Sequence, residues 1–436
     1  MNHQVAPQAP DAESSILGAM LKDQAATLKA ITALSADDFY RPAHAEIFAA
    51  CHALFASGSS VDLITVAEAI KAAGKINSIG GLAYLSSLVD MIPFPGMVDR
   101  YAPLVKEKAA ARRLIALSAR MMERCYRDEP IKVITEDFSR EFFDIITDKA
   151  QGARHISKVV EEVKAEIQEF HENGVGAGIP TGYIDIDSRW NGMQRGELII
   201  LAARPSMGKT ALAVNVGVNA AKRGNRVLIF TMEMKDRSLV QRIMSSLSRV
   251  SGDSIRKGNL PEEYLTRVMD AGTRAAKLPI MIDETPGLSI TELTARAKMC
   301  AMKTGTDLII VDYLQLMTAK AENRTQEISV ISRGLKALAK ELNVPVLALS
   351  QLNRGVDERP DKRPVMRDLR ESGAIEQDAD VIAFIYRDDY YNRDEDNPLR
   401  GQSEIITAKQ RNGPTGMDKM VFRGEFSQFL TMEQNR

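Results

Sequence analysis

The sequence has few cysteines and no long apolar run, and these absences exclude several protein classes. Its three cysteines, Cys51, Cys125 and Cys300, are scattered over 436 residues and form no C-x-x-C pair. This spacing argues against a zinc site or a disulfide framework and is typical of the reducing cytoplasm. The N-terminus lacks the basic and apolar segments of a signal peptide, and no run approaches the roughly 18 apolar residues of a membrane span. We therefore expect a cytoplasmic protein with no membrane partner.

Histidine and net charge are also low. All five histidines lie within the first 171 residues, so the rest of the chain has no imidazole for metal binding or acid–base chemistry. The formal net charge is −1 at pH 7, so any contact with nucleic acid must come from a local basic patch. A hydrophobic fraction of 44% allows a sizeable core. The length allows about two to three domains.

The chain divides into a helical part and an α/β part. From Ser14 onward apolar residues recur at helical spacing, and segments near 97–127 and 131–149 predict an antiparallel helical hairpin. After Thr181 continuous apolar runs alternate with helical stretches, which indicates a parallel sheet covered on both faces. The last segment, around "NGPTG", predicts antiparallel strands. The expected parts are a helical domain over 1–150, a linker over 151–180 and an α/β domain over 181–436. The helical domain is expected to serve interaction or assembly, with a purely structural cap as the alternative.

The linker contains a helix with one apolar face. That face holds Ile156, Val159, Val160, Val163, Ile167 and Phe170. Three glycines then form a flexible tether before Pro180. A tethered helix of this kind must bury its apolar face, either on its own chain or on a neighbouring subunit, and the pattern leaves both open.

A phosphate-binding loop is predicted at "ARPSMGKT". It follows an apolar strand and precedes a helical stretch, which is the strand–loop–helix order that the chemistry requires. Ala203 occupies the position of the usual first glycine, and alanine fits there if its φ is negative. In this pattern Gly208 lets the backbone approach the phosphates, Lys209 reaches the β- and γ-phosphates, and Thr210 ligates Mg²⁺. The expected nucleotide-binding residues are Arg204, Ser206, Met207, Gly208, Lys209, Thr210 and Ala211.

Three polar residues near strand ends extend the predicted site. Asp312 ends the apolar strand "LIIVD" and is expected to hold the Mg²⁺. Glu233 ends "RVLIFTME" and is the expected group that activates water, because Tyr313 follows Asp312 where another class of ATPase has glutamate. The alternative for Glu233 is an exposed charge that caps the next helix. Gln351 ends "VPVLALSQ" and either senses the γ-phosphate or makes a hydrogen bond within its loop.

Two basic segments bear on possible partners. Lys409 and Arg411 are separated by one residue, so they project from the same face of an extended strand. They are either a solvated strand end or groups that complete a neighbour's site, as an arginine finger does. The stretch 354–370 has six basic and four acidic residues and no apolar period, which predicts an exposed loop. Taken alone, its composition favours a solvated loop over one that grips the phosphates of DNA.

Five blocks of the chain resemble the RecA-like ATPase of bacterial replicative DNA helicases of the DnaB type. In order, they are "ARPSMGKT", "TMEM", "VDYLQLM", "SQLNRGVDERPDKRPVMRDLRESGAIEQDADVI" and "KQRNGPTG". The resemblance implies an α/β fold class: an all-helical N-terminal collar domain and a RecA-like P-loop domain with a mostly parallel sheet and antiparallel C-terminal strands. It implies an ATP-dependent DNA helicase. Such an enzyme is a ring-shaped homohexamer that uses ATP and Mg²⁺ to translocate on encircled single-stranded DNA and unwind the replication fork. Primase and a helicase loader are the implied partners.

The resemblance also implies residue roles. The implied catalytic set is Lys209, Glu233, Asp312, Gln351, Lys409 and Arg411, of which the last two act on the adjacent subunit's site. The implied metal ligands are Thr210 and Asp312, the implied DNA contacts are Arg370, Glu371 and Gly373, and the helix 156–171 is implied to pack on the next subunit. Two rivals remain: a recombinase-type filament, and a binding protein that uses nucleotide only as a switch and separates no strands.

Overall fold

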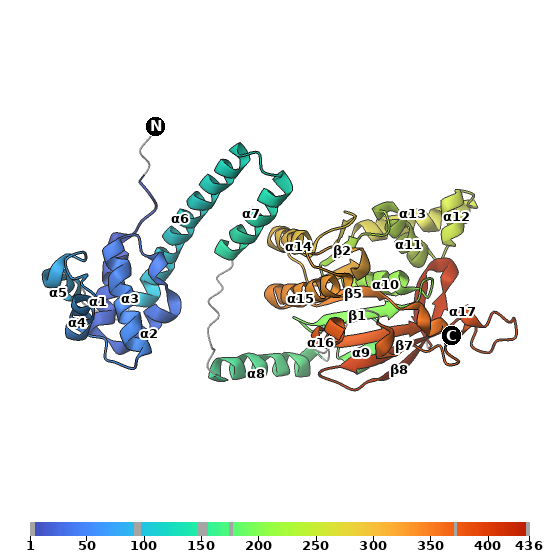
Figure 1. Ribbon diagram of the computed structural model, residues 1–436. Coiled ribbons are helices and arrows are strands. Elements are labelled where there is room, and N and C mark those ends of the chain that lie inside the picture. Colours follow the sequence, from blue (N-terminus) through green and yellow to red (C-terminus); the bar gives the residue numbers. More distant parts are fainter. Residues whose placement is uncertain (1–4, 91–96, 147–155, 174–177, 370–372, 433–436) are drawn as a thin grey trace. The chain divides into compact units, whose positions relative to one another are not determined.

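The chain forms two compact units, one up to Val160 and one from Glu161 onward (Figure 1). The computed structural model describes residues 5–90, 97–146, 156–173, 178–369 and 373–432. Among these residues, no helix combines the length and the apolar character that crossing a bilayer requires.

The first unit is helical. Its helices are α1 (Pro10–Lys22), α2 (Gln24–Ala33), η1 (Ala36–Asp38), α3 (Pro42–Ala56), α4 (Leu63–Ala72), α5 (Gly81–Asp90), α6 (Val98–Tyr126) and α7 (Ile131–Ile146). Short side chains define where several of them begin: the Asp62 carboxylate accepts hydrogen bonds from the backbone N–H groups of Ile64 and Thr65, both at 2.9 Å. α6 and α7 pack as a pair, with Arg120 joined to Glu141 at 2.5 Å.

A polar cluster is buried in the core of this unit. His44 is fully buried, and its Nδ1 lies 2.7 Å from the Glu13 carboxylate while its Nε2 lies 2.6 Å from the Tyr84 hydroxyl. Glu13 also accepts a hydrogen bond from the backbone N–H of Tyr40 at 2.7 Å. Because these buried polar groups pair with one another, the cluster joins α1, α3 and α5 rather than offering a reactive site.

The second unit contains one large sheet. The described residues contribute nine strands to it, in the order β3-β2-β4-β5-β1-β6-β7-β8-β9. The strands are β1 (Leu198–Ala203), β2 (Val227–Thr231), β3 (Ile280–Asp283), β4 (Leu308–Asp312), β5 (Val346–Gln351), β6 (Val381–Tyr386), β7 (Gln402–Gln410), β8 (Gly416–Arg423) and β9 (Gln428–Thr431). β1 to β6 pair in parallel, and β7 to β9 are antiparallel additions next to β6. The predicted fold class is confirmed.

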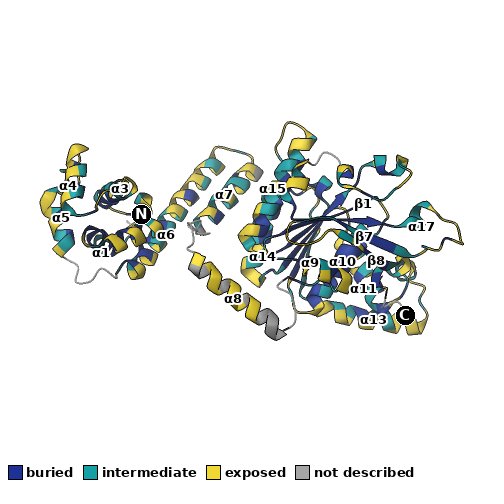
Figure 2. Ribbon diagram, turned by 90° about the horizontal axis from the view of Figure 1, so that it is seen from below, coloured by how far each residue is buried: buried dark blue, intermediate teal, exposed yellow. Residues whose placement is uncertain are grey.

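Helices cover both faces of this sheet (Figure 2). They are α9 (Ile184–Trp190), α10 (Lys209–Lys222), α11 (Asp236–Ser248), α12 (Gly252–Lys257), α13 (Glu262–Ala276), α14 (Ile290–Thr304), α15 (Arg324–Leu342), α16 (Gly373–Asp378) and α17 (Asp388–Tyr391). Side chains alternate between the two faces along β1: Ile199 and Leu201 pack with α10, whereas Leu198 and Ile200 pack with α15. Since the parallel strands are buried on both faces, their sequences are continuously apolar.

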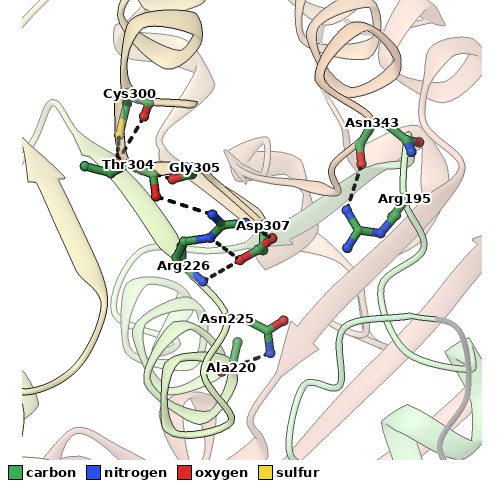
Figure 3. Close-up of polar contacts among 9 residues, drawn as sticks. All are labelled: Arg195, Ala220, Asn225, Arg226, Cys300, Thr304, Gly305, Asp307 and Asn343. Carbon is green, nitrogen blue, oxygen red and sulfur yellow. Dashed lines mark hydrogen bonds and ion pairs between the residues drawn. The ribbon is translucent and has the colours of Figure 1, made fainter. Parts of the chain in front are cut away.

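The parallel strands define two edges of the sheet. We call the edge where they begin the amino edge and the edge where they end the carboxyl edge. At the amino edge, Arg226 precedes β2 and binds Asp307, which precedes β4, through three hydrogen bonds of 2.8 Å (Figure 3). The hydrogen bond from Arg226 is the main reason that the pKa of Asp307 lies below its ordinary value. This pair fixes the start of two neighbouring strands.

The polar stretch predicted as an exposed loop over 354–370 is instead partly buried, so that prediction was wrong in part. It contains two short 3₁₀ segments, η4 (Arg354–Glu358) and η5 (Met366–Asp368). Val356 is fully buried and Leu369 is 6% exposed. Arg363 donates to the Glu404 carboxylate of β7 at 2.7 and 2.9 Å. Arg363 therefore pairs with the sheet, which composition and periodicity alone do not reveal.

Candidate active site

The predicted phosphate loop connects β1 to α10 at the carboxyl edge. Ala203 is the last residue of β1 and pairs with Gln351 on one side and Ile385 on the other. It is absent from the described residues with positive φ, so alanine fits its extended conformation, as predicted. Ser206 and Gly208 do have positive φ, at 65° and 96°. The tight turn that exposes backbone N–H groups therefore lies after Ala203.

Lys209, Thr210 and Asp312 meet at this edge. The Thr210 hydroxyl donates to Asp312 Oδ2 at 2.8 Å, and the Lys209 ammonium lies 4.2 Å from the centre of the Tyr313 ring. Burial lowers the pKa of Lys209, although the nearby carboxylates of Asp312 and Glu233 oppose that shift. Burial likewise raises the pKa of Asp312 against the opposing charge of Lys209. The Lys209 ammonium and the Asp312 carboxylate are thus both poorly solvated. A bound anion would stabilise the ammonium, and a bound cation would stabilise the carboxylate.

The oxygen atoms at this site fit a divalent cation. Asp312 is 2% exposed, and its Oδ1 is buried without a hydrogen-bond partner in the described part of the chain. Buried carboxylate oxygens are normally satisfied, so an unsatisfied one indicates a missing partner. Carboxylate and hydroxyl oxygens are the ligands that Mg²⁺ prefers, and Thr210 supplies the second of them.

Glu233 lies in the turn that follows β2, beside this cluster. The Met232 N–H donates to the Asp312 backbone carbonyl at 2.9 Å, and the Thr231 hydroxyl donates to the Met234 carbonyl at 3.0 Å. These bonds hold the turn against β4. Glu233 itself is exposed, yet its charge acts on the ionisation of Lys209, Asp312 and Tyr313. The structure therefore brings Glu233 together with the phosphate loop.

Gln351 ends β5 next to β1, and its backbone is held by Gln315. The Gln315 side chain accepts from the Gln351 N–H at 3.2 Å and donates to the Gln351 carbonyl at 3.1 Å. Within the described residues the Gln351 side chain has no hydrogen bond of its own. Gln351 is thus held at the carboxyl edge by its backbone, while its side-chain amide is available for a ligand. Sequence reasoning missed Gln315, although it lies within the quoted block "VDYLQLM".

The first residue of the loop points away from the phosphate side. The Arg204 guanidinium donates to the Asp357 carboxylate at 2.6 and 3.0 Å and to the Leu352 carbonyl at 3.0 Å. Met207 and Ala211 are buried in the core. Of the predicted nucleotide-binding side chains, Lys209 and Thr210 face the charged cluster, while Arg204 instead ties the loop to η4.

Two arginines near the loop were not found from the sequence. Arg242 of α11 is partly buried, and burial lowers its pKa while Asp312 and Glu233 raise it. Arg387, after β6, donates to the Ser206 carbonyl at 3.4 Å and lies over the Phe422 ring. Neither arginine stands in a recognisable motif; the order of strands and helices brings both to the loop.

Lys409 and Arg411 lie at the amino edge, away from the phosphate loop of their own chain. The backbone N–H of Arg411 donates to the backbone carbonyl of Asp380. The Asp380 side chain in turn accepts a hydrogen bond from the backbone N–H of Leu198, the first residue of β1. The loop starts after Ala203, five residues further along that strand, which corresponds to roughly 16 Å. The structure therefore does not bring these two residues to the cluster around Lys209.

The predicted DNA contacts are described only in part. Arg370 and Glu371 lie outside the described residues. Gly373 is exposed and is the first residue of α16.

Family models match most of the described chain. The model of the DnaB-like helicase N terminal domain matches residues 5–107, and that of the DnaB-like helicase C terminal domain matches residues 178–431. The chain is 42% identical over 443 residues to the replicative DNA helicase DnaB of Geobacillus stearothermophilus, covering 99% of this chain and 96% of that one. It is also 42% identical over 446 residues to the DnaB of Haemophilus influenzae, covering 99% and 95%.

Solved structures give the same relationship. A DnaB-like replicative helicase, studied with its interactions with primase, superposes with a TM-score of 0.68 at 30% identity and covers 97% of this chain and 100% of its own. A second solved structure, of an isolated ATPase domain, superposes with a TM-score of 0.60 at 34% identity and covers 64% of this chain and 100% of its own.

Proposed function

The chain belongs to the DnaB-like replicative DNA helicases, and on that premise we propose how its residues unwind DNA. It is an ATP-dependent DNA helicase of the replication fork. The proposal is that it works as a homohexameric ring that encircles single-stranded DNA, hydrolyses ATP with Mg²⁺ and translocates along the strand. Its parts are a helical collar over 1–150, a linker over 151–180 and a motor domain over 181–436.

In the proposed site, each residue near the loop has one task. Lys209 binds the β- and γ-phosphates, and the loop backbone around Gly208 lines them. Thr210 and Asp312 hold Mg²⁺, which neutralises charge on the phosphate oxygens. Glu233 orients and deprotonates the attacking water, and Gln351 senses the γ-phosphate.

One observation carries the proposal: the phosphate loop with Lys209 lies at the carboxyl edge of the sheet, whereas Lys409 and Arg411 lie at its amino edge. Because Arg411 lies roughly 16 Å along the strands from its own loop, it serves hydrolysis only if the amino edge of one subunit meets the carboxyl edge of the next. Such a head-to-tail contact joins different surfaces and closes into a ring when the rotation between subunits allows it. We propose that Lys409 and Arg411 complete the adjacent subunit's site in this way.

The linker helix supports the same assembly. On α8 (Ile156–Asn173), the apolar residues whose burial the structure describes are exposed: Ile156 is 71% exposed and Ile167 is 59% exposed. We propose that this face packs on the next subunit of the ring. Arg370, Glu371 and Gly373 are proposed to contact the backbone of the encircled strand. Primase, which a related helicase engages, and a loader are the proposed protein partners.

A fork-unwinding assay tests this function. The assembled protein with ATP and Mg²⁺ is expected to separate a forked duplex, and Glu233→Gln is expected to keep nucleotide binding while ATP turnover and unwinding fall by about 10² or more. Asp236→Asn is the matched control, because Asp236 is an exposed acid three residues further on, at the first position of α11, and is absent from the charges that act on Lys209. It should unwind normally. Failure of the assembled wild-type protein to unwind rejects the helicase mechanism, and near-normal turnover by Glu233→Gln rejects that residue's role.

A further inference from the structure

The basic pair at the amino edge is held by the last turn of α16. The Lys409 ammonium donates to the carbonyls of Glu376 and Ala379, at 2.5 and 2.6 Å. The Arg411 guanidinium donates to the carbonyl of Gln377 at 2.6 Å. These carbonyls lie at or just past the end of a helix, where backbone acceptors lack helical partners and where cations are favoured. The pair is therefore anchored rather than free in solvent.

A buried carboxylate completes this anchor. Asp380 is 5% exposed, and its Oδ1 lies 3.4 Å from a terminal nitrogen of Arg411. Its Oδ2 accepts hydrogen bonds from the Leu198 N–H at 2.8 Å and from the Lys336 ammonium at 2.5 Å. Because one oxygen is held by β1 and α15, the carboxylate is fixed in orientation. The other oxygen consequently presents a negative charge to Arg411 from a defined direction.

The pair needs such a negative charge. Burial is the main reason that the pKa of Lys409 is lowered, and the positive charge of the nearby Arg411 lowers it further. Two cations side by side repel each other, and the carboxylate of Asp380 offsets that repulsion. Both terminal nitrogens of Arg411 contact this anchor, yet the side chain remains 47% exposed and so is accessible from outside the chain.

We propose that Asp380 is a positioning residue for Arg411: it orients the guanidinium toward the nucleotide of the adjacent subunit. This inference rests on the proposed head-to-tail ring. A long, flexible arginine loses rate if its guanidinium is displaced, because stabilisation of the transition state depends on close placement of the charge. Since Asp380 lies at the opposite edge from its own phosphate loop, its removal should act on turnover in the adjacent pocket and leave nucleotide affinity almost unchanged.

A double-mutant cycle with Arg411 tests the inference in the full-length, assembled protein. Asp380→Asn is expected to lower kcat about tenfold while KM for ATP stays within about twofold. In the Arg411→Ala background, turnover followed with radiolabelled ATP should fall no further when Asp380→Asn is added, because the group that Asp380 orients is gone. A purely structural role would lower turnover by the same factor in both backgrounds.

Glu197→Gln is the matched control. Glu197 is another buried carboxylate of the amino edge, 9% exposed, whose Oε1 accepts from the Asn412 amide at 3.3 Å. Burial, followed by the charge of Asp380, raises its pKa, which means that the site disfavours the charged form. Glutamine removes that charge and keeps an acceptor oxygen for Asn412. Turnover of this control should stay within about twofold of wild type.

A second variant guards against misfolding. Asp380→Asn leaves Lys336 as a buried cation with a weaker partner, so Asp380→Asn with Lys336→Met removes both members of that pair. It should show the same loss of kcat and the same dependence on Arg411. Normal kcat in either folded variant, or equal losses with and without Arg411, overturns the positioning role alone. Normal turnover in Arg411→Ala overturns the trans-acting arginine of the proposed function as well, so the two failures are distinguishable.

Discussion

Substitution of Gly208 by alanine is the sharpest test of the phosphate loop. The residue has a φ of 96°, which side chains with a Cβ rarely adopt. A Cβ there would lie 3.0 and 3.1 Å from two atoms of the Phe429 ring and 3.3 Å from Phe422. Gly208→Ala therefore combines a backbone penalty with crowding from an aromatic pair, the buried Phe429 and the partly buried Phe422, whose ring centres are 4.6 Å apart.

The expected cost follows from these two contributions. A left-handed conformation costs a non-glycine residue about 1–2 kcal/mol, and crowding in a packed region adds about 1–3 kcal/mol. For a unit of this size, 1 kcal/mol corresponds to about 2–4 °C in Tm, so we expect a loss of roughly 5–15 °C. The matched control is Gly258→Ala, since Gly258 has a φ of 69° and open space around the added Cβ. It should show only the backbone penalty.

Thermal unfolding with and without nucleotide measures both the stability and the site. MgATP at about 100 times its Kd should raise the stability of wild type and of Gly258→Ala by about 2.7 kcal/mol. Gly208→Ala should lose this gain, because crowding against the Phe429 and Phe422 rings displaces the turn whose N–H groups line the phosphates. Phe429→Leu should also cost less in the Gly208→Ala background than in wild type, because it relieves the crowding. The reasoning is refuted if Gly208→Ala melts within about 2 °C of Gly258→Ala and still gains full stabilisation from MgATP.

Two further predictions concern the edges of the sheet. Because Arg226 lowers the pKa of Asp307 below its ordinary 3.8, the pair stabilises the fold above that pH and loses its contribution as the pH falls through the lowered value. Asp307→Asn should therefore reduce Tm at pH 7, and its deficit relative to wild type should shrink steadily in melts at pH values below 3.8. Mixing Lys209→Ala and Arg411→Ala chains in equal amounts should restore turnover at about a quarter of the subunit contacts, where an intact loop meets an intact arginine. Turnover no higher than that of either inactive variant, in mixed rings shown to contain both chains, would contradict a shared pocket.

The parts of the molecule that depend on local pattern were predictable from the sequence. Continuous apolar runs gave the parallel strands, and the residues that end them, Asp312 and Gln351, lie at the carboxyl edge beside the loop. The geometry of parallel strands requires this, because their carboxyl ends share one edge. Ala203 also has the extended backbone conformation that the last residue of a strand requires, and alanine adopts it without strain. The helical first unit likewise follows from spacing and helix caps.

The remaining parts depend on which strands become neighbours, and local pattern does not encode that. Arg387 and Phe422 meet the loop because β6 pairs with β1 and because β8 folds back through β7. Arg242 reaches the carboxylates from a helix that has no motif. The prediction for the stretch after β5 was wrong in part because two of its charges find partners far along the chain: Arg363 pairs with Glu404, and Asp357 pairs with Arg204. Its mixed composition resembles that of a solvated loop until those partners are known.

The separation of Lys209 and Arg411 onto opposite edges has a consequence for defective copies of the chain. In the proposed ring, each subunit contributes to two pockets, one on either side of it. A copy that lacks only Lys209 silences one pocket, whereas a copy that lacks both residues silences two, so the doubly defective chain poisons mixed rings more strongly. For the same reason, a ring opened at one seam carries an unmatched loop at one end and an unmatched arginine at the other, and hydrolysis stops at that seam alone.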